Sequence, residues 1–92
     1  MAVKFRKQAV KFLQKARPEE AAKIQNQINQ LYKSVSDRGI IPFNELDIKK
    51  MKGKWEGFYR LRISKIRVVF IVELTASDIE IYAIGYRGDI YK

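Results

Sequence analysis

The sequence predicts an α+β fold with the element order β-α-α-β-β-β, in which a helical hairpin packs on a small antiparallel sheet. Residues 9–35 carry apolar side chains at helical spacing, and residues 58–84 carry them at the alternating spacing of strands. Residues 36–57 show no periodicity but contain several turn signals. A chain of 92 residues, of which 47% are hydrophobic, can bury one modest core, so we expect a single domain over residues 1–92.

A short strand and two helices are expected in the N-terminal half. Residues 2–5 are long enough for the strand. The apolar stripe of the first helix is Ala9, Phe12, Leu13 and Ala16. Pro18 suits the first position of a second helix, and Glu19 and Glu20 fall in its first turn, where the helix dipole favours negative charge. The apolar stripe of the second helix is Ala21, Ile24, Ile28, Leu31, Tyr32 and Val35, and the two helices form an antiparallel hairpin.

Three strands are expected in the C-terminal half. They span residues 58–63, 65–74 and 79–84, and the short spacers between them favour consecutive hairpins and hence an antiparallel meander. Residues 36–57 form a long connection, of a kind that is often functional or ordered by a partner. We expect the helices to cover one face of the sheet and to leave the other face available.

The chain is strongly basic, with 19 lysines and arginines against 10 acids and a net charge of +9. The excess is concentrated in residues 1–17, which contain no acid, and in residues 49–67, where Glu56 is the one acid. Clustering of this kind favours nucleic acid or an acidic protein as the partner. The alternative is a soluble domain whose surface is merely basic.

The chain contains no cysteine and no histidine. This excludes disulfides and thiolate nucleophiles, and it removes the usual general base and the usual metal ligand. Glycine-rich phosphate loops and metal-ligand spacings are also missing, so we expect no cofactor and no metal. No apolar run reaches the length of a membrane span and the N-terminus lacks the apolar stretch of a signal peptide, so we expect a cytoplasmic protein without a membrane partner.

Three arginines lie within the predicted strands. Arg60 and Arg62 are two residues apart, so they emerge on one face of the sheet about 7 Å apart at the backbone and can converge on one phosphodiester. Arg67 opens the next strand, close across the hairpin. A guanidinium is always charged, and its planar fork matches phosphate oxygens. The alternative is that these arginines are solvated or pair with acids, of which the neighbouring strands offer only Glu73 and Glu80.

The end of the chain adds Arg87 and the tyrosines Tyr82, Tyr86 and Tyr91, which we expect to cluster near the end of the sheet. Unpaired RNA bases stack on aromatic rings and on guanidinium planes. Tyr82 alternates within a strand, so a core position is expected for it, whereas Tyr91 suits packing and function equally. RNA carries its own nucleophile, the 2′-hydroxyl, so a protein with these residues could cleave it by orienting that group and stabilising charge.

Four segments resemble the signature of the RelE/ParE superfamily of bacterial and archaeal toxins. They are Lys52-Gly53, Phe58–Arg62, Ile66–Phe70 and Gly85–Tyr91. The predicted first strand and both helices resemble the family as well. The resemblance implies a RelE-like fold and the toxin of a type II toxin–antitoxin system. Such a toxin is a metal-independent endoribonuclease, or mRNA interferase, which cleaves mRNA in the A site of the 70S ribosome through 2′-hydroxyl attack and thereby inhibits translation. A cognate antitoxin protein blocks it.

The resemblance also implies roles for individual residues. Those that contact the scissile phosphate or activate the 2′-hydroxyl are Arg60, Arg62, Arg67, Arg87 and Tyr91. Lys52 and Lys54 would hold ribosomal RNA or message. We also expect Lys49, Lys50 and Lys65 to bind RNA or the ribosome, because they belong to the same basic part of the chain. Relatives often have lysines at positions 60 and 62, and an arginine essentially cannot lose its proton, so the candidates for the proton acceptor are Tyr91, Glu56 and solvent.

Two alternatives remain beside the ribonuclease. The first is the ParE-type branch of the same fold, which inhibits DNA gyrase and generally lacks the full set of arginines and tyrosine. The second is a non-catalytic basic module that binds nucleic acid or an acidic protein with the same surface, with a steep dependence on salt.

Overall fold

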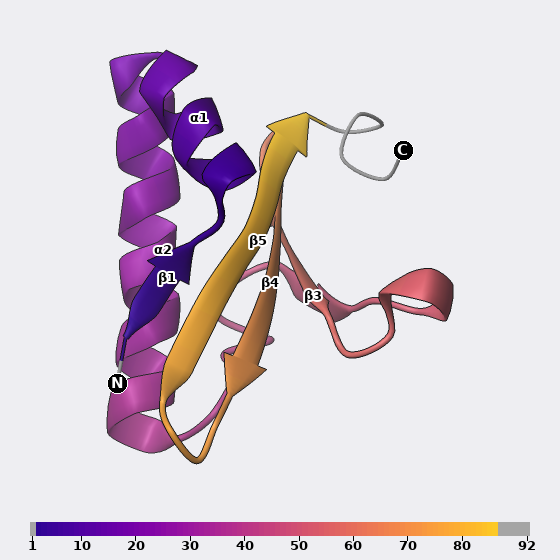
Figure 1. Cartoon of the computed structure of the whole chain (residues 1–92). Helices are drawn as coiled ribbons and strands as arrows, with labels where there is room; N and C mark the ends of the chain where they lie inside the picture. The colour runs from indigo at the N-terminus through magenta and orange to yellow at the C-terminus, as the bar shows by residue number, and fades with distance from the viewer. Residues whose placement is uncertain (1, 87–92) are drawn as a thin grey trace.

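The molecule is a five-stranded sheet with two helices on one side (Figure 1). The structure is a computed structural model that describes residues 2–86. In chain order the elements are β1 (Val3–Phe5), α1 (Lys7–Lys15), α2 (Pro18–Arg38), β2 (Ile48–Lys50), the short 3₁₀ helix η1 (Gly53–Trp55), β3 (Tyr59–Ile63), β4 (Ile66–Glu73) and β5 (Asp78–Tyr86). The strand order is β1-β5-β4-β3-β2, and all neighbours are antiparallel except β1 and β5. The predicted α+β fold is confirmed.

One strand, β2, falls within the segment that the sequence predicts to be a connection. It pairs antiparallel with β3, which places Ile48 opposite Leu61 and Lys49 opposite Arg60. Three residues are too few to display the alternation of a strand, so the sequence pattern misses it. This strand forms the edge of the sheet beside β3, so its residues lie next to the predicted arginines Arg60 and Arg62.

The second helix begins where the sequence indicates but continues to Arg38, three residues into the segment that the sequence predicts to be a connection. Pro18 occupies its first turn together with Glu19 and Glu20. It ends at Gly39, whose φ of 66° lies in the left-handed region that glycine adopts without steric cost, and whose amide donates to the Val35 carbonyl at 3.0 Å. Neither of the helices described is long and apolar enough to cross a membrane.

The core lies between these helices and one face of the sheet, which we call the helical face. Six strand residues of this face are fully buried, namely Leu61, Val68, Phe70, Ile79, Ile81 and Ile84. The predicted helical stripes are confirmed for most of their residues: Ala9, Ile24, Ile28, Leu31 and Val35 belong to this core, and Phe12, Leu13 and Tyr32 pack against it. Ala16 and Ala21 are only partly buried. Burial of this apolar surface is the main stabilising term of the fold.

Gln8 of α1 continues the sheet edge where β1 stops. The parallel pairing of β1 with β5 covers only residues 79–81 of β5. Further along β5, the side-chain Nε2 of Gln8 donates to the backbone carbonyl of Ile84 at 2.7 Å. The backbone N–H of Ile84 donates in turn to the side-chain Oε1 of Gln8 at 2.8 Å. One side chain thus takes the place of a strand at the end of β5, so backbone groups there keep their partners.

The opposite face, which carries Arg60, Arg62 and Arg67 and which we call the arginine face, is partly covered. The segment with η1 projects on this side of the sheet, away from the helices (Figure 1). Val69 lies on this face opposite Arg60 and is fully buried, although it is not part of the main core. The expectation that the second face is simply left available is therefore wrong, because the β2–β3 connection folds over part of it.

Candidate functional site

The arginine face brings three of the predicted residues onto adjacent strands. Arg60 and Arg62 alternate with Leu61, which is buried on the helical face. Arg67 of β4 lies directly opposite Arg62, where cross-strand Cβ atoms are about 5 Å apart. Three guanidinium groups therefore belong to one small area, which is the arrangement that the alternation of the strands predicts.

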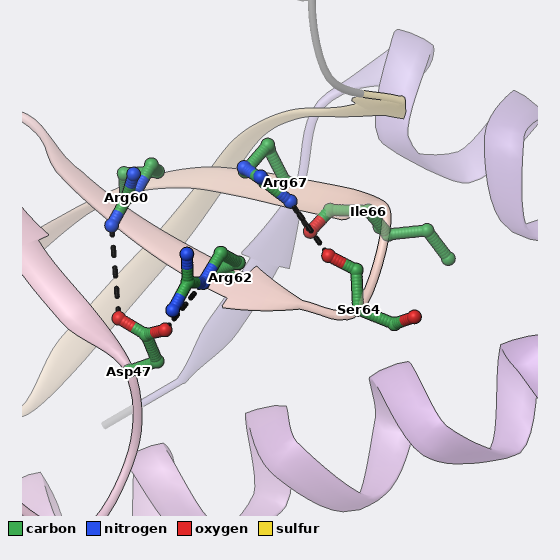
Figure 2. Close-up of polar contacts among 6 residues, drawn as sticks. All are labelled: Asp47, Arg60, Arg62, Ser64, Ile66 and Arg67. Atoms are coloured by element: carbon green, nitrogen blue, oxygen red, sulfur yellow. Dashed lines mark hydrogen bonds and ion pairs between the residues drawn. The ribbon is translucent and has the colours of Figure 1, made fainter.

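Asp47, which the sequence pattern does not single out, is the counter-ion of two of these arginines. The Nε atom of Arg62 donates to Oδ2 of Asp47 at 2.5 Å, and Nη2 of Arg60 lies 3.7 Å from Oδ1 (Figure 2). The expectation that only Glu73 and Glu80 could pair with the arginines is wrong. Asp47 directly precedes β2 and lies opposite Arg62 because Ile48 pairs with Leu61. The sequence pattern does not predict this pairing.

The two expected acids have other partners. Glu73 accepts hydrogen bonds from the amide and hydroxyl of Thr75, at the turn that follows β4. Glu80 forms an ion pair with Arg6 at 3.4 Å. Asp47 is thus the acid that the structure places beside the arginine pair.

The guanidinium of Arg60 is only partly satisfied. Its side chain is 21% exposed, and its Nε and Nη2 atoms are buried without a hydrogen-bond partner among the described residues. The distance from Nη2 of Arg60 to Oδ1 of Asp47 is short enough for an ion pair but too long for a hydrogen bond. A buried donor without an acceptor is costly, and a phosphate supplies two acceptor oxygens in the geometry of the guanidinium fork.

Arg67 is built into the hairpin between β3 and β4. It is 7% exposed, and its Nη1 atom donates to the carbonyl of Ser64 at 2.8 Å and to that of Ile66 at 3.2 Å (Figure 2). Ser64 has a φ of 56°, in the left-handed region that is uncommon for a residue with a side chain. Arg67 therefore stabilises this turn, in addition to any contact with a ligand.

The predicted lysines are all exposed and lie in different places around the arginines. Lys49 is opposite Arg60, whereas Lys50 is opposite Tyr59, on the helical side of the sheet edge. Lys52 and Lys54 belong to the projecting segment at η1, and Lys65 lies in the turn between β3 and β4. The predicted acceptor Glu56 is exposed and directly follows η1.

Tyr82 and Tyr86, which the sequence predicts to cluster, lie on opposite faces of the sheet. Tyr86 lies opposite Ile66 on the helical side, where its ring packs against Phe12 and its hydroxyl donates to Glu20 at 3.3 Å. Tyr82 lies on the arginine face, at an irregularity of the β4–β5 pairing, and is partly exposed rather than in the core. Such a bulge re-aims the side chains of the strand.

Arg87 and Tyr91 lie outside the described residues. Within residues 2–86 no three His, Cys, Asp or Glu side chains gather in a group that could hold a metal ion. The chemistry of the described site is therefore that of a cationic surface with a single carboxylate, Asp47, beside its arginine pair.

Solved structures with the same architecture are toxins and toxin–antitoxin complexes. The chain is 28% identical to a RelE–RelB complex chain from Pyrococcus horikoshii, with a TM-score of 0.73 and 96% of each chain covered. It is 25% identical to a chain of a RelB–RelE complex from Methanococcus jannaschii, with a TM-score of 0.68; the match covers 97% of this chain and 95% of the other. A YoeB/ParE toxin from Agrobacterium tumefaciens is 18% identical, with a TM-score of 0.75; the match covers 95% of this chain and 99% of the toxin. No family model and no curated protein matches the sequence. The chain has the fold of the RelE-type toxins.

Proposed function

We propose that this protein is the toxin of a type II toxin–antitoxin pair and that it cleaves mRNA in the A site of the ribosome. The likeness to chains from two RelE–RelB complexes supports the toxin role. The observation that carries the chemistry is Arg60, whose guanidinium has two buried nitrogen atoms without hydrogen-bond partners among the described residues. Arg62 stands beside it on the same face.

The proposed reaction needs only a nucleophile that RNA already contains. The 2′-oxygen of one nucleotide attacks the adjacent phosphorus, its proton passes to an acceptor, and the bond to the 5′-oxygen of the next nucleotide breaks. The leaving 5′-oxygen takes up a proton from the acceptor or from solvent, so the products are a 2′,3′-cyclic phosphate and a 5′-hydroxyl. Negative charge grows on the phosphoryl oxygens in the transition state, and fixed guanidinium groups stabilise that charge without reorganisation.

Arg60 and Arg62 hold the scissile phosphate in this proposal. A phosphate oxygen takes the place that Asp47 occupies beside them, and it supplies the acceptor that Arg60 lacks. Arg67, Arg87 and Tyr91 complete the proposed catalytic set. Because arginine cannot act as a base at neutral pH, the proton passes to Glu56, Tyr91 or solvent.

The remaining partners follow from the same proposal. Lys49, Lys50, Lys52, Lys54 and Lys65 bind the phosphates of ribosomal RNA or message. A cognate antitoxin covers the cationic surface and blocks access to it. The reaction needs no metal, and it takes place in the cytoplasm, where the 70S ribosome translates.

The test is to map message ends after brief induction of the chain in cells. We expect cuts within translated codons, with growth arrest. Arg60→Ala should lower the rate of cleavage on translating ribosomes about 100-fold, since loss of one transition-state contact of this kind costs about 3 kcal/mol. Arg17→Ala removes the same charge at an exposed position before α2 and should leave cleavage unchanged.

Two results would contradict the proposal. Intact messages with inhibited DNA supercoiling would assign the chain to the gyrase inhibitors. RNA binding with steep salt dependence but no cleavage, even on translating ribosomes, would make the protein a non-catalytic basic module.

A further inference from the structure

Beside the arginine pair, three aromatic side chains from separate segments form one cluster on the arginine face. Trp55 comes from η1, Phe58 directly precedes β3, and Tyr82 comes from β5. Their ring centroids are 5.3 Å apart for Trp55 and Phe58, 5.7 Å for Trp55 and Tyr82, and 5.0 Å for Phe58 and Tyr82, with interplanar angles of 74–85°. We call this group the aromatic cluster.

The aromatic cluster lies outside the main core and is not sealed from solvent. The core of the molecule is on the helical face, and none of the three residues belongs to it. All three are partly exposed. Aromatic side chains that keep exposed surface on the face opposite the core offer a flat apolar contact to a partner.

Positively charged side chains lie close to the aromatic cluster, and of these Arg6 also pairs with Glu80. The guanidinium carbon of Arg6 lies 4.9 Å from the centroid of the Tyr82 ring. Lys54 is adjacent to Trp55 in the chain, and Arg60 follows Phe58 by two residues on the same face of β3. A partner that matches both features presents flat rings and negative charge together, which is the chemistry of unpaired nucleic acid.

The spacing links the aromatic cluster to the proposed phosphate site. Phe58 and Arg60 are about 7 Å apart along the strand, which is the scale of one nucleotide in an extended single strand. We propose that the aromatic cluster, with Arg6, is a stacking site for a base of the same unpaired RNA whose phosphate is held by Arg60. This inference rests on the proposed function and adds to it a second contact, which reads a base rather than the backbone.

The test uses Trp55, which is the single tryptophan of the chain, as the reporter. The probe is a hexanucleotide of 2′-O-methyl RNA, which cannot be cleaved because the nucleophile is blocked. We expect it to quench the Trp55 fluorescence of the full-length protein to saturation. Inorganic polyphosphate of equal charge should bind without comparable quenching, because it carries no base.

Variants separate stacking from charge. Trp55→Leu should weaken binding of the hexanucleotide about tenfold, measured by anisotropy of a labelled probe, and leave polyphosphate binding unchanged. Trp55→Phe should retain most of the affinity. Tyr82→Leu provides a second test that keeps Trp55 as the reporter, and circular dichroism confirms that each variant is folded.

Three outcomes would overturn the stacking site. They are saturable binding of the hexanucleotide without quenching, equal losses of hexanucleotide and polyphosphate affinity in Trp55→Leu, and quenching by an acidic peptide but not by the hexanucleotide. The last outcome would assign the aromatic cluster to a protein partner. Because the probe cannot be cleaved, these results are independent of message mapping, so the ribonuclease proposal and the stacking site fail or stand separately.

Discussion

On the helical face, β4 presents Val68 and Phe70, which are fully buried against the helices. On the arginine face the same strand presents Arg67 and Val69, and the neighbouring strand presents Arg60. Both faces contain buried residues, but they are covered differently. The helices α1 and α2 cover the helical face with apolar side chains. The β2–β3 connection, ion pairs and three aromatic rings cover part of the arginine face.

The two faces contribute unequally to the free energy of folding. Close packing of apolar side chains gives a large and specific free energy, so the helical face determines whether the chain folds. Exposed ion pairs such as that of Arg62 with Asp47 contribute little to stability. The helical face therefore supplies most of the stability, and the arginine face contributes little through its exposed ion pairs.

The largest expected effect breaks the helical face. Phe70 is fully buried and stacks on Tyr59 with ring centroids 5.6 Å apart. Phe70→Ala should lower the free energy of unfolding by about 3–5 kcal/mol, measured by urea titration. Ile71→Ala is the matched control on the other face of the same strand, where the side chain is half-buried, and should cost about 1–2 kcal/mol. Equal losses for the two variants would refute the comparison of the faces.

A smaller effect is expected where α1 meets the sheet edge. Gln8→Ala removes both side-chain hydrogen bonds to the backbone of Ile84, so it should cost about 1–2 kcal/mol and speed hydrogen exchange of the Ile84 amide. Gln14→Ala removes an exposed amide of the same helix and should change neither quantity. If the Ile84 amide exchanges at the same rate in both variants, Gln8 is not the cap of that edge.

The smallest expected effect concerns Asp47, which pairs with Arg60 and Arg62 and, in the proposed function, competes with an anionic ligand for them. Asp47→Asn keeps the size of the side chain but removes its charge, so affinity for the hexanucleotide should rise about threefold to tenfold at low salt and less at high salt. Glu45→Gln is the control, because Glu45 pairs with Arg38 instead. A fall in affinity would mean that Asp47 positions the arginines rather than competing with their ligand.

The helices and the three long strands are predictable from the sequence because their patterns are long. The stripe through Ile24, Ile28 and Leu31 repeats over several turns and is buried as predicted. Alternation along β3 likewise places Arg60 and Arg62 on one face. Pro18 and the two acids that follow it predict the start of α2 from local chemistry alone.

The partners of the arginines are not predictable in the same way. Asp47 is 15 residues before Arg62, and nothing between them shows the three-residue strand that brings them together. Tyr82 alternates like a core residue, but the irregular pairing of β5 places it with Trp55 and Phe58. The hydrogen bonds of Arg67 to the turn depend on a left-handed Ser64 that the sequence does not indicate.

The fold class, the helical core and the face on which Arg60 and Arg62 lie are all encoded in local patterns, because periodicity is a local property of the chain. Three features follow from the folded arrangement alone: Asp47 pairs with those arginines, part of the Arg60 guanidinium lacks an acceptor among residues 2–86, and an aromatic cluster lies beside it. These features depend on strand register and on the path of one connection. Both are set by the free energy of the whole packed chain rather than by any one segment.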